Sequence, residues 1–400
     1  MDFRIENIEK IEDSMLPYAH WLYSINGIGS KTIRHILAQV ETPEALYRLP
    51  KEKIESVLPP LGRKPELAEK IVVSRQKHDI WEEYLRLVDR QIKFTCIGHS
   101  DYPYRLSNIS DAPYGIYYRG KLPEQSRPSV AIIGARNCSE YGRRMAKYFG
   151  SELAMMGVQV ISGMARGIDG IGQKAALEAG GYSLGVLGCG VDICYPEENR
   201  ALYDMLCLQG GACSEYLPGI MPKNSLFPPR NRIISGLSDI VLVIEAKNRS
   251  GTLITVDMAL EQGKEVYALP GRVTDALSEG CNRLLQQGAG IALSPQEIVK
   301  ELMGKVGVLQ KERSFCNRKA DGKNVTQTID KCKNTTLLSD VQSKLIQILE
   351  EEPQPAEIIK EQLLSKTGCD LPMPELLNQL IKLCIFGLVR QVGNSYFAKN

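Results

Sequence analysis

The feature that most constrains the fold is an alternation of short apolar runs with helical segments between Val130 and Met303. The runs are rich in Val, Ile and Leu and begin at Val130, Val158, Ser183, Ile240 and Glu265. Near-continuous apolar strands separated by helices are typical of a parallel sheet that is covered on both faces. The pattern therefore predicts a doubly wound, Rossmann-like α/β domain, which we assign to residues 91–303.

Glycines and small polar residues follow several of the predicted strands. They occur at Gly134–Arg136, Ser162–Gly167, Gly188–Gly190 and Ser250–Thr252. Because ligands of such sheets bind at the carboxyl ends of the strands, where helix N-termini point, we expect an anion to bind there. No loop after the first strand carries the G-x-G-x-x-G fingerprint, so a bound NAD is not expected. We predict no cofactor for this chain.

A second feature is the segment MPKNSLFPPRNRIISG, residues 221–236. It holds Lys223, Arg230 and Arg232 without an acidic residue, and Phe227 lies between the cations. Guanidinium groups match phosphate oxygens, and an aromatic ring offers a face on which an unpaired base can stack. With its prolines, the segment is expected to form a stiff loop that binds single-stranded nucleic acid. An ordinary helix start with solvated charges is the alternative.

The composition limits the partners and the compartment. The 400 residues carry a net charge of +2, so a polyanion site must be a concentrated patch on a nearly neutral protein. No secretory signal is evident and no run approaches the ~20 apolar residues that span a bilayer, so we expect a cytoplasmic protein without membrane association. Eleven cysteines without a C-x-x-C pair favour reduced thiols over disulfides or a metal site.

Residues 1–90 have helical spacing and are assigned to an N-terminal domain of the helix-hairpin-helix or SAM-like type. The Gly27-Ile28-Gly29 hinge, followed by Lys31, resembles a helix-hairpin-helix loop, which can bind a backbone phosphate. The spacing of a nucleotide-hydrolysing P-loop is absent. A purely structural hairpin and a DNA contact both remain open.

The chain is expected to continue as a flexible basic linker over residues 304–335 and a winged-helix-like domain over residues 336–400. This last domain shows three helical segments and a hairpin that turns at Gly393-Asn394. Its third helix is dominated by leucine and isoleucine, with Lys382 nearly its only cation. We therefore expect a protein-binding or structural role for this domain.

Six motifs, taken in order, support a family resemblance. They begin at Gly134 (GARNCSEYG), Ser162 (SGMARGID), Val186 (VLGCGVDICYPEEN), Phe227 (FPPRNRIISGLSDIVLVIEA), Ser250 (SGTLIT) and Gly280 (GCNRLL). Together they resemble the DNA-processing protein A family (DprA/Smf). The resemblance implies single-stranded DNA binding in a basic pocket of the Rossmann domain, self-association as a homodimer, and loading of RecA recombinase during natural transformation.

The family's pocket maps onto individual residues of this chain. Arg136 is expected to contact a phosphate together with amides near Ser139, and Phe227 is expected to stack on a base. With the glycine-rich strand ends included, the predicted DNA-binding residues are Arg136, Ser162, Gly163, Arg166, Lys223, Phe227, Arg230, Asn231, Arg232, Ser250, Gly251 and Thr252.

One position departs from the family pattern, because Gln173 stands where the family's second motif carries a histidine. A catalytic role for this motif is therefore not expected. Asp169, which remains, is expected to bond local backbone amides.

Two other functions are weighed against DNA binding. Nucleotide-cleaving hydrolases of the lysine-decarboxylase-like group have a similar core, but Thr255 stands where they carry a glutamate. All four histidines of this chain precede Val130, where the alternation of predicted strands and helices begins. The remaining carboxylates are expected to cap helices or to pair with arginines, so no enzyme activity is expected; they are Asp192, Glu215, Glu245 and Asp257. The other alternative is a non-catalytic sensor of a small phosphorylated signal.

Overall fold

The chain forms two compact units, Met1–Leu302 and Met303–Asn400. The computed structural model describes residues 15–60, 64–77, 79–303, 340–350, 352–368, 370–385, 389–392 and 396–399. The linker predicted over residues 304–335 lies outside the described residues. None of the helices in the described part is both long and apolar enough to cross a membrane.

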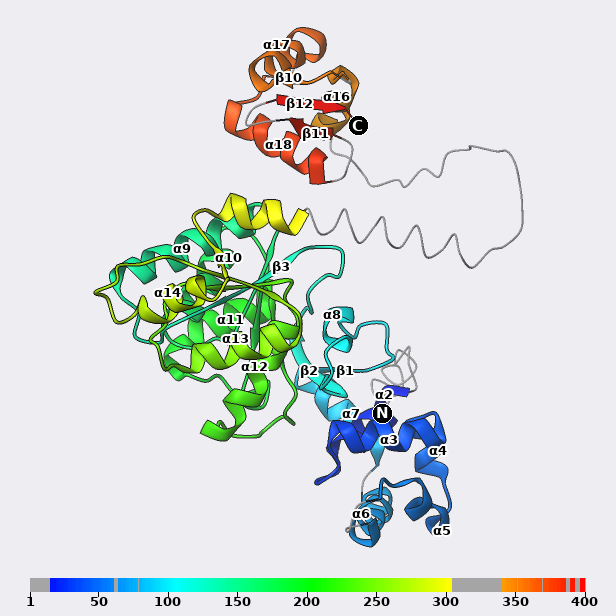
Figure 1. Ribbon diagram of the computed structural model, residues 1–400. Helices are drawn as coiled ribbons and strands as arrows, with labels where there is room; N and C mark the ends of the chain where they lie inside the picture. Colours follow the sequence, from blue (N-terminus) through cyan, green and yellow to red (C-terminus); the bar gives the residue numbers. More distant parts are fainter. Residues whose placement is uncertain are drawn as a thin grey trace, which may run out of the picture. The chain divides into compact units, whose positions relative to one another are not determined.

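A nine-stranded sheet forms the centre of the first unit, in the order β1-β2-β6-β5-β4-β3-β7-β8-β9 (Figure 1). The strands are β1 (Lys93–Cys96), β2 (Gly115–Gly120), β3 (Ser129–Ile133), β4 (Gln159–Ser162), β5 (Ser183–Val186), β6 (Gly211–Ser214), β7 (Ile240–Val243), β8 (Glu265–Ala268) and β9 (Gly290–Ile291). Strands β6 to β9 pair in parallel along this order, whereas β2 and β1 continue the sheet antiparallel at one edge. The predicted doubly wound α/β fold is confirmed.

Helices cover both faces of this sheet. Successive side chains of a strand point to opposite faces, so the apolar residues of a strand pack against helices on both sides. On β3, Ile133 packs in one apolar cluster with residues of α12 (Phe227–Gly236) and α13 (Gly251–Glu261). Its neighbour Ile132 meets Gly172 of α10 (Ile168–Glu178) on the other face. The connections are completed by α8 (Tyr104–Ser107), α9 (Glu140–Met155), η2 (Glu197–Asn199), α11 (Arg200–Gln209), η3 (Asn224–Leu226) and α14 (Glu279–Gln286), and residues 295–303 are helical.

Four strands were not predicted from the sequence, namely β1, β2, β6 and β9. Strand β6 reads GACS, which contains no β-branched or aromatic residue, yet all four of its residues are buried. It is a strand because β5 and β2 supply hydrogen-bonding partners on both sides. Strand propensity of so short a segment is overridden by such tertiary pairing.

The residues before the sheet are helical, as predicted. The helices are α2 (Met15–Ser24), α3 (Ser30–Val40), α4 (Pro43–Arg48), α5 (Lys51–Ile54), η1 (Glu55–Val57), α6 (Lys64–Lys77) and α7 (Ile80–Asp89). Trp21 and Ile33 of these helices belong to the same apolar cluster as Tyr117 of β2 and Leu206 of α11. Helices and sheet therefore share a core, and a domain boundary at residue 90 stays a prediction.

The second unit has a core of its own, formed by residues such as Leu345, Ile359, Leu380 and Phe397. Its elements are α16 (Asp340–Ile348), β10 (Gln354–Pro355), α17 (Ala356–Thr367), α18 (Met373–Ile385), β11 (Val389–Val392) and β12 (Tyr396–Lys399). The strands form an antiparallel sheet in the order β10-β12-β11. The predicted turn at Gly393-Asn394 lies outside the described residues, and the winged-helix assignment stays a prediction.

Candidate nucleic-acid interface

The strand order of the sheet reverses between β3 and β7. From β3 the chain winds through β4 and β5 to β6 on one side, and from β7 through β8 to β9 on the other. The loops that follow β3 and β7 therefore diverge and leave a crevice at the carboxyl ends of these two adjacent parallel strands. Ligands of open α/β sheets bind at this point of the fold.

A cavity of about 460 Å³ occupies this crevice. Six of the predicted DNA-binding residues line this cavity and are at least partly exposed. They are Arg136, Phe227, Asn231, Ser250, Gly251 and Thr252. Segments far apart in the sequence thus meet in one place, as the rule for strand ends predicts.

The cavity has two accessible cations. Arg136, which follows β3, and Lys247, which follows β7, are exposed and have no ion-pair partner among the described residues. Asp169 is the one carboxylate that lines the cavity within the described part of the chain. The mouth of the cavity therefore favours an anion.

Phe227 forms one wall of the cavity but does not protrude from a loop. It is the first residue of α12, and Pro228 and Pro229 occupy the first turn of this helix. The alternative of a helix start is thus correct for this part of the segment, but its expected solvated charges are not found, because Arg230 is buried and Arg232 is ion-paired. The half-buried ring contacts Gly188, where an added Cβ would lie 2.6 Å from a ring carbon.

An aromatic neighbour of Phe227 was missed by the sequence analysis. Tyr195 is 44% exposed, and its ring centroid lies 5.4 Å from that of Phe227 with an angle of 32° between the planes. Two adjacent rings offer a larger stacking surface than one. Tyr195 and Phe227 are far apart in the sequence, so no local sequence pattern indicates that their rings are in contact.

Arg230 also lines the cavity, but its side chain is nearly completely buried. It is 5% exposed, and its guanidinium donates hydrogen bonds to the carbonyls of Gly163, at 2.8 Å, and Val186. Burial lowers the pKa of Arg230, whereas the charge of Asp169 opposes this shift. In this structure the side chain of Arg230 links the loop after β4 to the end of β5, and its contact with DNA stays a prediction.

Asp169 accepts a hydrogen bond from the Gly163 amide at 3.2 Å, as predicted. Burial raises its pKa, while Arg230 and hydrogen bonds from Ser162 and the amides of Gly163 and Gly134 lower it. Asp169 and Arg230 are therefore partners in a buried network, and their mutual attraction compensates part of the cost of burying two charges.

Arg232 lies outside this cavity and is also not a free cation. Its two terminal nitrogens each lie 2.7 Å from an oxygen of Glu215, and its Nε lies 3.0 Å from Asp111. Burial lowers the pKa of Arg232, but the hydrogen bonds and charge of Glu215 outweigh it and raise the pKa overall. Arg232 therefore forms structural ion pairs in this structure, and its contact with DNA stays a prediction.

The four other residues that were predicted to bind DNA comprise two buried and two exposed residues. Ser162 and Gly163 are buried below the cavity, where the Ser162 hydroxyl donates to the Ile132 carbonyl at 2.6 Å. Arg166 is exposed but forms an ion pair with Glu198, and Lys223 is exposed on a neighbouring cavity. None of these four lines the switch-point cavity.

Gln173, at the position that departs from the family pattern, is fully buried. Its carbonyl oxygen accepts from the Met164 amide at 3.0 Å, and its amide nitrogen donates to the Leu184 carbonyl at 2.8 Å. Both hydrogen-bonding groups of the side chain are thereby satisfied. The residue connects α10 to the loop after β4 and to β5, which is a structural role.

The polar groups at the N-termini of α9 and α13 differ in whether they have hydrogen-bond partners. At α9 the Ser139 amide donates to Glu245 at 2.9 Å, so the expected phosphate contact near Ser139 is not available from this amide. At α13 the Ser250 hydroxyl is buried without a hydrogen-bond partner and makes no capping bond. The start of α13 therefore retains more capacity for an added acceptor than the start of α9.

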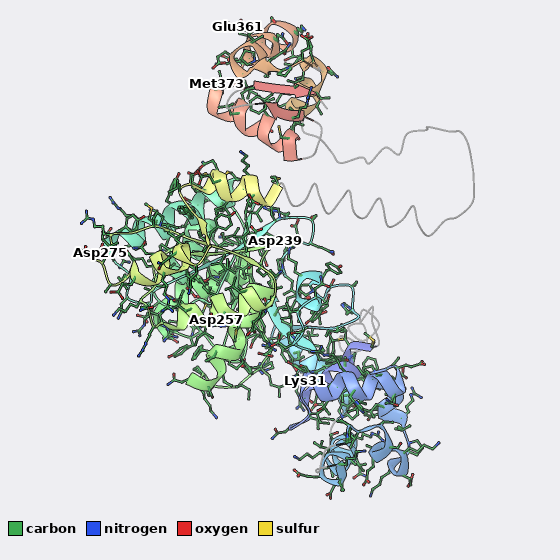
Figure 2. All side chains as sticks on the ribbon, in the orientation of Figure 1. Lys31, Asp239, Asp257, Asp275, Glu361 and Met373 are labelled. Atoms are coloured by element: carbon green, nitrogen blue, oxygen red, sulfur yellow. The ribbon has the colours of Figure 1, made fainter. Side chains whose placement is uncertain are left out.

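Three of the four carboxylates named in the sequence analysis have structural partners of the expected kind. Glu215 pairs with Arg232, Asp192 with Arg90, and Glu245 accepts from Ser139. Asp257, labelled in Figure 2, lies on the exposed side of α13. Within the described residues, no three His, Cys, Asp or Glu side chains are grouped to hold a metal ion.

Comparison with known sequences identifies the family of this chain. The sequence model of the family described as DNA recombination-mediator protein A matches residues 93–303. The chain belongs to this family. The DprA/Smf resemblance drawn from the six motifs is thereby confirmed.

Relatives within the DprA/Smf family cover most of the chain. Protein Smf of Escherichia coli is 33% identical over 387 residues, which is 96% of this chain and 91% of that protein. DNA processing protein DprA of Streptococcus pneumoniae is 42% identical over 231 residues, which is 55% of this chain and 80% of that protein. The X-ray structure of DprA from Streptococcus pneumoniae matches with a TM-score of 0.62 and 33% identity, and covers 71% of this chain and 97% of that chain.

Proposed function

We propose that this DprA/Smf protein binds single-stranded DNA, independently of sequence, in the cavity between β3 and β7. The observation that carries the proposal is that an aromatic side chain, Phe227, and two accessible cations, Arg136 and Lys247, line one cavity at the switch point of the sheet. The ring of Tyr195 lies beside that of Phe227. Cations attract the phosphates of any strand, and rings stack on any base. Neither interaction requires a particular base.

The proposal extends to the role of the bound strand. In line with the family resemblance, we propose that a homodimer of this protein loads RecA onto incoming DNA in the cytoplasm, and that it cleaves no bond in doing so. The measurement is RecA filament assembly on single-stranded DNA that is already covered by a single-strand-binding protein. Assembly should be faster with this protein present, and an unchanged rate would contradict the loading role.

The binding site is tested with Arg136→Ala and Phe227→Leu in titrations with labelled oligo-dT. Leucine keeps apolar volume against Gly188 and removes the ring, so the fold is retained while stacking is lost. Loss of stacking should weaken binding by ~1–3 kcal/mol, about 5-fold to 150-fold, and equally for other sequences. Arg144→Ala, at an exposed arginine of α9 outside the cavity, is the matched control and should bind like the wild type.

The alternatives differ from this proposal in two measurements. A nucleotide hydrolase would release free base from nucleoside monophosphates, and a small-molecule sensor would saturate with a mononucleotide regardless of strand length. A strand-binding protein should instead gain affinity with oligonucleotide length. Affinity that is independent of length would contradict single-strand binding.

A further inference from the structure

A second and larger cavity lies in the first unit, with a volume of about 1080 Å³. One wall is the Gly27–Gly29 hinge with the first turn of α3, and the facing wall includes residues of the 215–232 segment. Figure 2 shows Lys31 where the N-terminal helices adjoin the sheet-bearing part of this unit. The DNA-binding proposal does not use this cavity.

The charges that line this second cavity do not balance. Its two carboxylates, Asp111 and Glu215, are both bonded to Arg232. Lys31 and Lys223 are exposed on its walls and have no ion-pair partner within the described part of the chain. The free charge of the cavity is therefore positive and comes from both walls.

The backbone of the hinge is open at Gly29, which lines the second cavity. A Cβ at Gly29 would meet no atom within 4 Å, and the φ of Gly27 is +91°, which favours glycine. A phosphate can therefore approach this backbone closely without displacing a side chain.

The two cavities share one short segment. Asn224 and Phe227 line the switch-point cavity, whereas Lys223 and Leu226, from the same turn, line the second one. Residues 223–227 thus form a ridge only a few residues wide between an aromatic site and a cationic site. A polymer that fills the first cavity and continues past this ridge enters the second.

We infer that the second cavity binds the backbone phosphates of the same DNA strand, after the strand has crossed the ridge at residues 223–227, through Lys223 on one wall and Lys31 on the other. This inference rests on the proposed function, since it extends the path of the strand bound at Phe227. The hinge and α3 then serve as a clamp on the phosphate backbone in addition to packing on the sheet.

The test is the charge reversal Lys31→Glu, measured with oligo-dT from about 4 to 30 nucleotides, a range that brackets the site sizes of single-strand-binding modules. Strands too short to leave the first cavity should bind Lys31→Glu like the wild type, whereas long strands should bind about 3- to 10-fold more weakly. For Lys31→Ala, the slope of log affinity against log salt should become shallower by about 0.7 on long strands, the value of one lost phosphate contact. Lys53→Glu, at an exposed lysine of α5 outside the cavity, is the matched control.

The outcomes separate a failure of the path through the second cavity from a failure of DNA binding at the switch-point cavity. If Phe227→Leu weakens binding at every length while Lys31→Glu matches the wild type at every length, the second cavity is not on the path and the first site stands. Equal weakening by Lys31→Glu and Lys53→Glu, or equal loss on short and long strands, also overturns the inference. If Phe227→Leu and Arg136→Ala bind normally, the proposed function itself fails, and the path that starts at Phe227 fails with it.

Discussion

Three arginines that the sequence places at one DNA site have three different environments. Arg136 is exposed beside the cavity, Arg230 is buried against backbone carbonyls, and Arg232 is held by Glu215 and Asp111. A guanidinium that already donates to carbonyls or carboxylates has few donors left for phosphate. Only Arg136 of the three is therefore retained in the proposed binding site.

Arg232→Ala is expected to lower the free energy of unfolding by about 3 kcal/mol, because Glu215 would remain nearly buried without its partner. The side chains of Arg232 and Glu215 are each 12% exposed. Chemical denaturation is the measurement, and Arg136→Ala, which removes an exposed residue, should leave the midpoint nearly unchanged. A stable Arg232→Ala protein that no longer binds oligo-dT would show that this arginine contacts DNA after all.

Helix α12 explains why neighbours in sequence are separated in space. An α-helix rotates about 100° per residue, so consecutive side chains point in different directions. Arg230 points to the buried loops, Asn231 lines the switch-point cavity, and Arg232 lines the second cavity. The basic segment is therefore not one patch, although its residues are adjacent in the chain.

Helix α2 is linked to strand β2 by a buried histidine. His20 is 6% exposed, and its Nδ1 lies 2.9 Å from the hydroxyl of Tyr117. Burial lowers the pKa of His20 from 6.5 to about 4. The folded chain therefore keeps this ring neutral at pH values where the unfolded chain protonates it.

The stabilising contribution of a neutral His20 is present above pH 6.5 and is lost as the pH falls toward 4, since the unfolded state then binds one more proton. Each pH unit in this window should lower the free energy of unfolding by about 1.4 kcal/mol. Urea midpoints at pH 7 and pH 5 should differ less in His20→Asn than in the wild type. The control His35→Asn, at a less buried histidine, should keep the wild-type difference.

At the scale of the whole molecule, each of the two compact units has its own apolar core. All residues of the proposed DNA path belong to the first unit. Removal of residues 304–400 should therefore leave the affinity for oligo-dT within about twofold of the wild type. The same titration on the truncated and full-length proteins decides this, and a loss of tenfold or more would show that the second unit contacts DNA.

Much of the fold could be predicted because it rests on local pattern. The apolar runs specify β3, β4, β5, β7 and β8, and the rule that ligands bind at strand ends located Arg136 and Ser250–Thr252 correctly at one cavity. Strand β6 and the stacking partner Tyr195 could not be predicted, because both depend on neighbours that are distant in sequence.

The sequence by itself determined the family, the α/β architecture and the strand edge at which a ligand binds, since periodicity and ordered motifs are properties of the linear chain. Only the tertiary structure decided which cations are free. Ion pairs such as Arg232 with Glu215, and buried networks such as Arg230 with Asp169, form when separate elements are brought together. The availability of a charge depends on burial and partners, and a sequence lists charges without either.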